Sequence, residues 1–146
     1  MSQNETKENN ITITLSKNQL TYLENYAQKN KPLETCAILV GKLNNNQYIV
    51  MNIIQMENSA EKSEIRFSIN EEKLFELYKE IESMNLSIVA IFHSHPSIPF
   101  PSKTDILYMQ INPIPWIITS TITGNTKCFL YDEKERVKEI KLLVTG

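Results

Sequence analysis

The chain has 146 residues and only two histidines, His93 and His95, which are separated by a single residue. They directly follow the apolar stretch 88–92 (IVAIF). In an extended chain, side chains at positions i and i+2 point to the same side, so the two imidazoles project together. A metal ion needs this arrangement for two of its ligands. Because short motifs also occur on ordinary strand ends, the pair alone leaves a metal site and a surface pair both open.

Ser102 and Asp105 follow with the S-x-x-D spacing of a capping box at a helix N-terminus. Capping alone explains both residues. The same helix start can also direct Asp105 back toward the histidines, across a proline-rich loop at 96–101. Two histidines and one aspartate give zinc three protein ligands and an open fourth position, which is the catalytic form of a zinc site.

Hydrolysis at such a site needs a general base that is not itself a ligand. A catalytic zinc ion lowers the pKa of its bound water from about 15.7 to about 7. Among the 17 acidic residues, Glu34 stands out by its position directly before the apolar stretch 36–41 (CAILVG). An acid at that position lies either at a solvated strand edge or in a cleft, and the pattern leaves both open.

In combination, these features resemble the JAMM motif of the JAB/MPN metalloprotease family. The matching features are Glu34 within PLETCAILVG, the H-S-H-P run from His93, and the S-x-x-D spacing from Ser102. The resemblance extends from about residue 12 to residue 143. Because the long insertions of ubiquitin-specific members are missing, the chain is most similar to the minimal prokaryotic or archaeal type. Six residues separate His95 from Ser102, one fewer than is usual in the family.

The resemblance implies a zinc metallopeptidase. It implies that one Zn²⁺ ion per chain is bound by His93, His95 and Asp105. It further implies that Glu34 is the general base and that Ser102 stabilises the oxyanion.

Hydropathy patterns predict the elements that must position these residues. In chain order they are strand 11–15, a helix capped by Ser16 and ending near 30, strands 35–43 and 48–54, a charged loop at 56–64, strand 67–69, a helix capped by Asn70, strand 86–92, helix 102–110, and antiparallel strands 116–123, 127–132 and 137–143. We predict an α+β fold, an α/β/α sandwich in which helices flank a mixed, mainly antiparallel central sheet. Residues 1–10 are expected to form a disordered tail, and 11–146 a single JAB/MPN-like domain.

Composition excludes several classes of protein. With 15 Lys and Arg against 17 Asp and Glu, the net charge of -2 argues against a nucleic-acid partner. The apolar stretches are too short to span a bilayer, and the polar N-terminus has no signal-like apolar region. Two cysteines cannot form a disulfide framework, so we expect a cytoplasmic protein without a membrane partner. The sequence does not indicate the oligomeric state.

From the resemblance we expect an isopeptidase that cleaves the amide after the C-terminal glycine of a ubiquitin-like or sulfur-carrier conjugate. Alternatives are a processing peptidase for sulfur-carrier precursors and a small-amide hydrolase. A non-catalytic MPN scaffold subunit is disfavoured, because such subunits tend to lose the ligands. A RadC-like DNA-repair relative is disfavoured by Ser94 between the histidines and by the overall acidity. Cys36 is either a buried small hydrophobe or a redox-active thiol, and Trp116 either a core aromatic or part of a substrate groove.

Overall fold

The structure is a computed structural model that describes residues 11–56, 71–134 and 136–146. These residues form seven strands and three helices. In chain order the elements are β1 (Thr12–Ser16), α2 (Lys17–Asn30), β2 (Cys36–Asn44), β3 (Gln47–Met56), α3 (Glu71–Ser83), β4 (Ser87–His95), α4 (Lys103–Ile111), β5 (Trp116–Ser120), β6 (Thr126–Asp132) and β7 (Arg136–Thr145). The predictions for the tail 1–10, the loop beyond residue 56, the strand 67–69 and the Asn70 cap lie outside the described residues.

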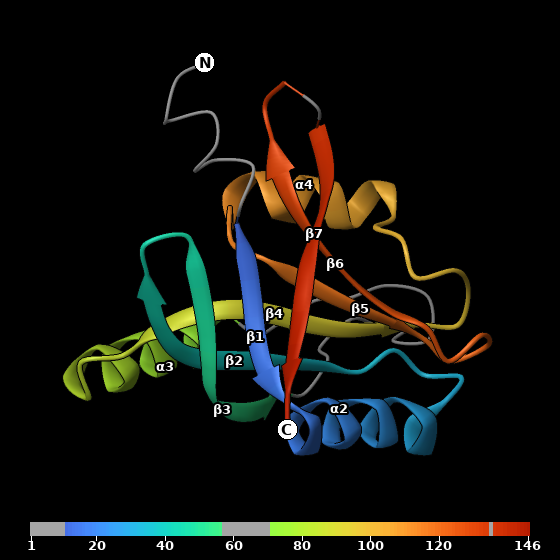
Figure 1. The fold of residues 1–146 in the computed structure, drawn as a ribbon, viewed down its shortest axis with the longest axis horizontal. Coiled ribbons are helices and arrows are strands. Elements are labelled where there is room, and N and C mark those ends of the chain that lie inside the picture. The colour runs from blue at the N-terminus through green and yellow to red at the C-terminus, as the bar shows by residue number, and fades with distance from the viewer. Residues whose placement is uncertain (1–10, 57–70, 135) are drawn as a thin grey trace.

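The seven strands form one closed sheet in the order β1-β3-β2-β4-β5-β6-β7 (Figure 1). The closing strand is β1, which pairs in parallel with β3 on one side and with β7 on the other. Ile13 lies opposite Tyr48 in the first pairing and opposite Leu142 in the second. The β4–β5 pairing is also parallel, and the remaining four pairings are antiparallel.

The predicted α/β/α sandwich is therefore wrong: the protein is a closed, mixed β-barrel with helices packed on it. A sandwich needs an open sheet with two faces, whereas β1 joins the two strands that would have been its edges. Alternation in β1 predicts an amphipathic strand, and Ile13 and Leu15 are indeed buried. This alternation carries no information on which strands pair with β1. The β1–β7 pairing joins residues as far apart in the sequence as Thr12 and Lys141.

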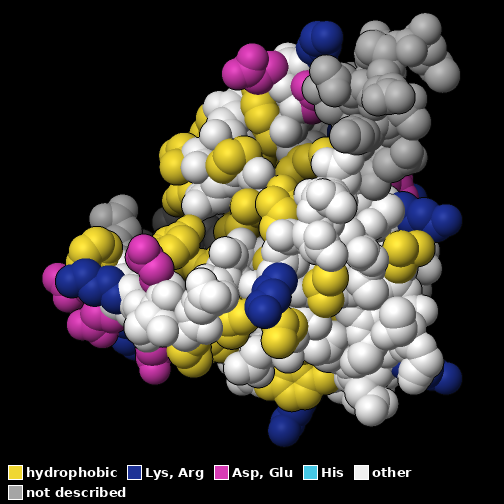
Figure 2. Space-filling view, turned by 60° about the vertical axis from the view of Figure 1, so that its left-hand side comes forward, with side chains coloured by type: hydrophobic (Ala, Val, Ile, Leu, Met, Phe, Trp, Pro, Cys, Tyr) yellow, Lys and Arg dark blue, Asp and Glu magenta, His cyan; other side chains and the backbone are white. Residues whose placement is uncertain are grey.

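Two hydrophobic clusters lie on the two faces of the strands. The first contains residues from all seven strands together with Leu23 and Ala27 of α2. The second lies on the other face of β2, β4 and β5 and is covered by α3, through Leu77 and Ile81, and by α4, through Met109. On the face of the molecule shown in Figure 2, basic and acidic side chains are interspersed rather than gathered by sign.

Most predicted elements are present, with shifted ends. Ser16 caps α2, as predicted, in a capping box that also uses Gln19. Strand β4 continues to His95, three residues beyond its predicted end, so both histidines belong to the strand itself. Strand β5 ends early, at Ser120, because the Ser120 hydroxyl accepts the backbone N–H groups of Ile122 and Thr123 and turns the chain.

Candidate metal centre

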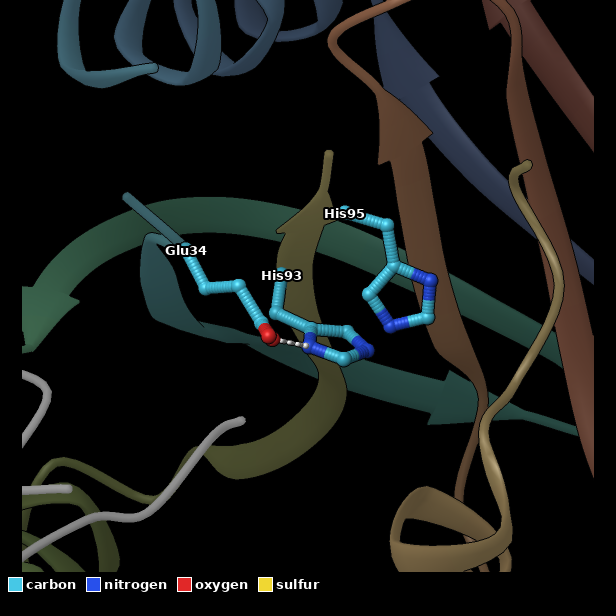
Figure 3. A group of neighbouring side chains, drawn as sticks. All are labelled: Glu34, His93 and His95. Carbon is cyan, nitrogen blue, oxygen red and sulfur yellow. Dashed lines mark ion pairs between the residues drawn. The ribbon is translucent and has the colours of Figure 1, made fainter. Parts of the chain in front are cut away.

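The two histidines project from the end of β4 on the face that carries the second cluster. His93 alternates with Ile91, a member of that cluster, and is completely buried, while His95 is 6% exposed. Their rings lie edge to face with centroids 4.5 Å apart (Figure 3). The i, i+2 spacing thus places both imidazoles on one side of the strand, as the sequence predicts.

Strand pairing on both sides holds the backbone of this strand end. His93 lies opposite Cys36 of β2 and opposite Ile118 of β5. The carbonyl oxygen of His95 accepts the backbone N–H of Thr121 at 2.9 Å, and Gln28 of α2 donates to the carbonyl of Thr121. Backbone hydrogen bonds on both sides therefore hold the strand end that carries the two imidazoles.

Asp105 reaches the histidines from the first turn of α4. The Ser102 hydroxyl accepts the Asp105 backbone N–H at 3.1 Å, and the Ser102 N–H donates to Asp105 Oδ2 at 2.8 Å. The same Oδ2 lies 3.0 Å from His95 Nε2 and 3.4 Å from His93 Nε2. One carboxylate therefore completes the capping box and contacts both histidines. The positive end of the helix dipole also stabilises its negative charge.

Glu34 enters from the segment that precedes β2. Its Oε1 lies 3.5 Å from His93 Nδ1 (Figure 3). Glu34 therefore faces one edge of the His93 ring while Asp105 faces the other. Donor atoms of Glu34, His93 and His95 all lie within 4.8 Å of one another, so this trio also forms a possible metal-binding group.

The buried charges strongly perturb protonation. Burial by itself lowers the pKa of His93, but Asp105 and then Glu34 beside it raise that pKa to about 9. Burial by itself raises the pKa of Asp105, but the charge on His93 and hydrogen bonds from His93, His95 and the Ser102 N–H hold it well below its usual range. The site therefore favours a positive charge between the imidazoles and the carboxylates.

Two of the donor–donor distances fit a tetrahedral metal ion. Donors of a tetrahedral zinc site with bonds of about 2.0–2.1 Å lie about 3.3 Å apart. The distances from Asp105 Oδ2 to the two Nε2 atoms, 3.0 and 3.4 Å, fall close to this value. His95 Nδ1 lies 3.3 Å from the carbonyl oxygen of Ile98, which can only accept, so the tautomer with its proton on Nδ1 would satisfy that carbonyl and leave Nε2 for an ion.

Two ligand sets can be compared on this geometry. Asp105 Oδ2 faces the Nε2 atoms of both histidines, whereas the Glu34 carboxylate contacts His93 at Nδ1. An ion between the two Nε2 atoms therefore meets Asp105 directly and has Glu34 as a neighbour. On these distances, His93, His95 and Asp105 are the residues that would hold an ion between the two Nε2 atoms, and Glu34 would remain beside it.

Ser102, the fifth predicted site residue, is exposed at the start of α4. Its hydroxyl oxygen accepts the Asp105 N–H, and a hydroxyl that accepts one hydrogen bond keeps its own hydrogen for donation. The short loop between His95 and Ser102 still allows α4 to reach the strand end. Within it, Phe100 packs edge to face on Phe129 of β6 with ring centroids 5.3 Å apart.

Two other residues take the structural roles considered for them. Cys36 is buried, its thiol donates to the carbonyl of Met56, and burial, followed by the nearby Glu34, raises its pKa to about 12. Trp116 is buried and donates to the carbonyl of Asn112. The carbonyl of Ile98 beside His95 Nδ1 could not be predicted from the sequence, because every residue carries a backbone acceptor.

The closed barrel and the cluster at the end of β4 define the class of domain. Residues 18–132 match the family described as prokaryotic homologs of the JAB domain, and all five predicted site residues lie within that span. The chain belongs to this family.

Individual relatives agree with this assignment. The chain is 32% identical over 113 residues to a protein named desampylase from Pyrococcus furiosus, covering 77% of this chain and 76% of the relative. Among solved structures, it superposes with a TM-score of 0.78 on a protein from Desulfitobacterium hafniense, at 24% identity and with 92% and 93% of the two chains covered. A protein from Salinibacter ruber superposes with a TM-score of 0.66 at 17% identity, with 91% of each chain covered. At these identities the solved structures show the fold alone.

No helix in the described ranges is both long and apolar enough to cross a membrane.

We predict that Asp105→Asn weakens metal binding by at least about 10- to 100-fold, the loss caused by changing even an outer-shell partner, because the amide keeps the shape of the carboxylate but loses its charge. The wild type should bind about one zinc ion per chain and remain folded without it, since a domain of this size has its own core. Zinc titration with elemental analysis, alongside circular dichroism, measures both. Asp132→Asn, at the distant end of β6, is the matched control. Equal affinities of the two variants would exclude Asp105 as a ligand.

We also predict that metal binding releases a proton. Without an ion, His93 has a pKa raised to about 9, so below that pH an ion must displace the proton. Affinity should therefore rise about tenfold per pH unit between about pH 6.5 and 8. Calorimetry in buffers of different ionisation enthalpy counts the released protons. The same affinity at both pH values, with no proton release, would contradict the arrangement described for His93.

Proposed function

We propose that the protein is a zinc-dependent isopeptidase that cleaves the amide after the C-terminal glycine of a ubiquitin-like or sulfur-carrier conjugate. The observation that carries the proposal is the convergence of His93 Nε2, His95 Nε2 and Asp105 Oδ2 with the carboxylate of Glu34 beside them. Membership of the JAB family and the relative named desampylase support hydrolysis of ubiquitin-like conjugates. A cytoplasmic location accompanies this proposal, since both cysteines are unbridged thiols.

The three convergent donors would hold the zinc ion. When bound, zinc in such a site activates water near neutral pH and polarises the scissile carbonyl. The remaining chemistry falls to the side chains around it.

Glu34 is the proposed general base. The residue is 5% exposed, and its carboxylate lies within 4.8 Å of the donor atoms of both histidines, a separation that one water molecule can bridge by hydrogen bonding. In this role Glu34 accepts a proton from the attacking water and delivers it to the leaving amine. Its Oε1 also lies 3.5 Å from His93 Nδ1, so a proton on Nδ1 would favour this orientation of the carboxylate.

Ser102 is the proposed oxyanion donor. It lies at the solvent-exposed start of α4, one turn from Asp105, with its hydroxyl hydrogen available. A donor fixed by a helix cap needs little reorganisation as negative charge develops on the carbonyl oxygen.

Burial of the ligands supports a slender substrate. His93, His95 and Asp105 are each 6% exposed or less, so only a narrow segment can carry a carbonyl to them. A tail that ends in glycine has no side chain to obstruct that approach. The two alternatives are a processing peptidase for sulfur-carrier precursors and a small-amide hydrolase. They would use the same chemistry and differ in the amide that is cleaved.

We predict that Glu34→Gln keeps its zinc and loses about 10²–10⁴-fold in turnover, the usual contribution of general acid–base catalysis. The amide has nearly the same shape but cannot accept the proton. The measurement is cleavage of a ubiquitin-like conjugate by the zinc-loaded variant. Glu80→Gln, on the exposed side of α3, should cleave at the wild-type rate. Full activity of Glu34→Gln would assign the base elsewhere.

We further predict that replacing the terminal glycine of the conjugate by valine abolishes cleavage, because the branched side chain cannot enter beside the buried ligands. Glycine and valine versions of one conjugate are compared by gel assay with the same enzyme. If both are cut equally, the enzyme does not recognise the tail, and the small-amide alternative takes precedence. If neither is cut although zinc is bound, the scaffold alternative takes precedence.

A further inference from the structure

Ser94, the residue between the two histidines, has a role that the chemistry above does not use. Strand alternation turns its side chain to the opposite face of β4 from the imidazoles, and it is completely buried. Its hydroxyl accepts the backbone N–H of Thr35 at 2.9 Å and shares a hydrogen bond with the Thr35 hydroxyl, also at 2.9 Å. The Ser94 N–H donates to the Thr35 carbonyl at 3.1 Å. Three hydrogen bonds thus join Ser94 to the residue next to Glu34.

The pairing is irregular at the point where the chain enters β2. In a regular antiparallel pair of this kind, two residues exchange both backbone N–H···O bonds. Here the Ser94 N–H makes one of these bonds, but the Thr35 N–H is satisfied by the Ser94 side chain. Regular pairing begins one residue later, at Cys36 opposite His93. The hydroxyl of Ser94 therefore fixes how the segment bearing Glu34 leaves the sheet.

We propose that the Ser94–Thr35 pair is a positioning device that holds Glu34 in reach of the reacting water. This inference rests on the proposed function, because it requires Glu34 to be the base. Ser94 touches no reacting group and acts only through Thr35. Since a displacement of about 1 Å at a reacting group costs up to about 10²-fold in rate, the pair controls turnover from the far face of the strand.

The chain offers a matched control in Thr119. It lies beside Ser94 in the β4–β5 pairing, is 1% exposed, and uses its hydroxyl to bond the Thr126 hydroxyl at 2.7 Å. Thr119→Val therefore removes a buried hydroxyl equally close to the histidine strand. Unlike Ser94, Thr119 makes its hydroxyl bond away from the segment that carries Glu34.

The experiment measures kcat, KM and zinc content for conjugate cleavage. Ser94→Ala should lower kcat about 10- to 100-fold with KM and zinc content unchanged. Ser94→Thr, which keeps a hydroxyl at the same carbon, should restore most of the rate, and Thr119→Val should stay within about twofold of wild type. Equal losses in Ser94→Ala and Thr119→Val would overturn the inference, because any buried hydroxyl would then have the same effect.

A double-mutant cycle separates positioning from general destabilisation. In the Glu34→Gln background, Ser94→Ala should cause no further loss of kcat, because there is no base left to position. Losses that multiply would overturn the inference. If Ser94→Ala does not fold, Thr35→Val removes only the bond between the hydroxyls and enters the same cycle. Failure of the zinc-loaded wild type to cleave the conjugate refutes the proposed function, and a fully active Glu34→Gln variant refutes the role of Glu34 as base. An inactive Glu34→Gln with a fully active Ser94→Ala refutes only the role of the pair.

Discussion

The arrangement of the site depends on one oxygen atom, Asp105 Oδ2. It accepts the Ser102 N–H at the start of α4 and faces Nε2 of both His93 and His95 from 3.4 Å or less. The atom therefore ties the helix to the end of β4, and its negative charge is stabilised from both sides. Because the side chain is 3% exposed, that charge has little access to water. A cation between the imidazoles and the carboxylate is the natural complement to this geometry.

The closed sheet supplies the rigidity that such a cluster needs. Strand β4 is paired on one side with β2 and on the other with β5, so neither histidine lies on a free edge. Two hydrophobic clusters pack the two faces of these strands. The side chains of this cluster are thus fixed by the fold, which would lower the conformational entropy lost on binding an ion.

The features of the site that local rules determine can be predicted from the sequence. The same-side projection of His93 and His95 follows from strand geometry, and the cap at Ser102 follows from the S-x-x-D spacing. The position of Glu34 beside them follows from the resemblance to the family rather than from any local rule, and the structure places it next to His93.

Features that depend on distant pairing remain hidden in the sequence. Closure of the barrel requires β1 to lie between β3 and β7, and nothing in its alternation selects these neighbours. The bond from the Thr35 N–H to the Ser94 hydroxyl joins positions 59 residues apart. Backbone acceptors such as the carbonyl of Ile98 are present in every residue, so residue type cannot reveal them.

The most direct test of the account is a crystal structure of the zinc-loaded protein with diffraction data collected at the zinc absorption edge. We expect one anomalous peak bonded, at about 2.0–2.2 Å, to Nε2 of His93, Nε2 of His95 and an oxygen of Asp105. Glu34 should lie beside the ion without binding it. A peak bonded to Glu34 in place of Asp105, or no peak between the two imidazoles, would contradict the account.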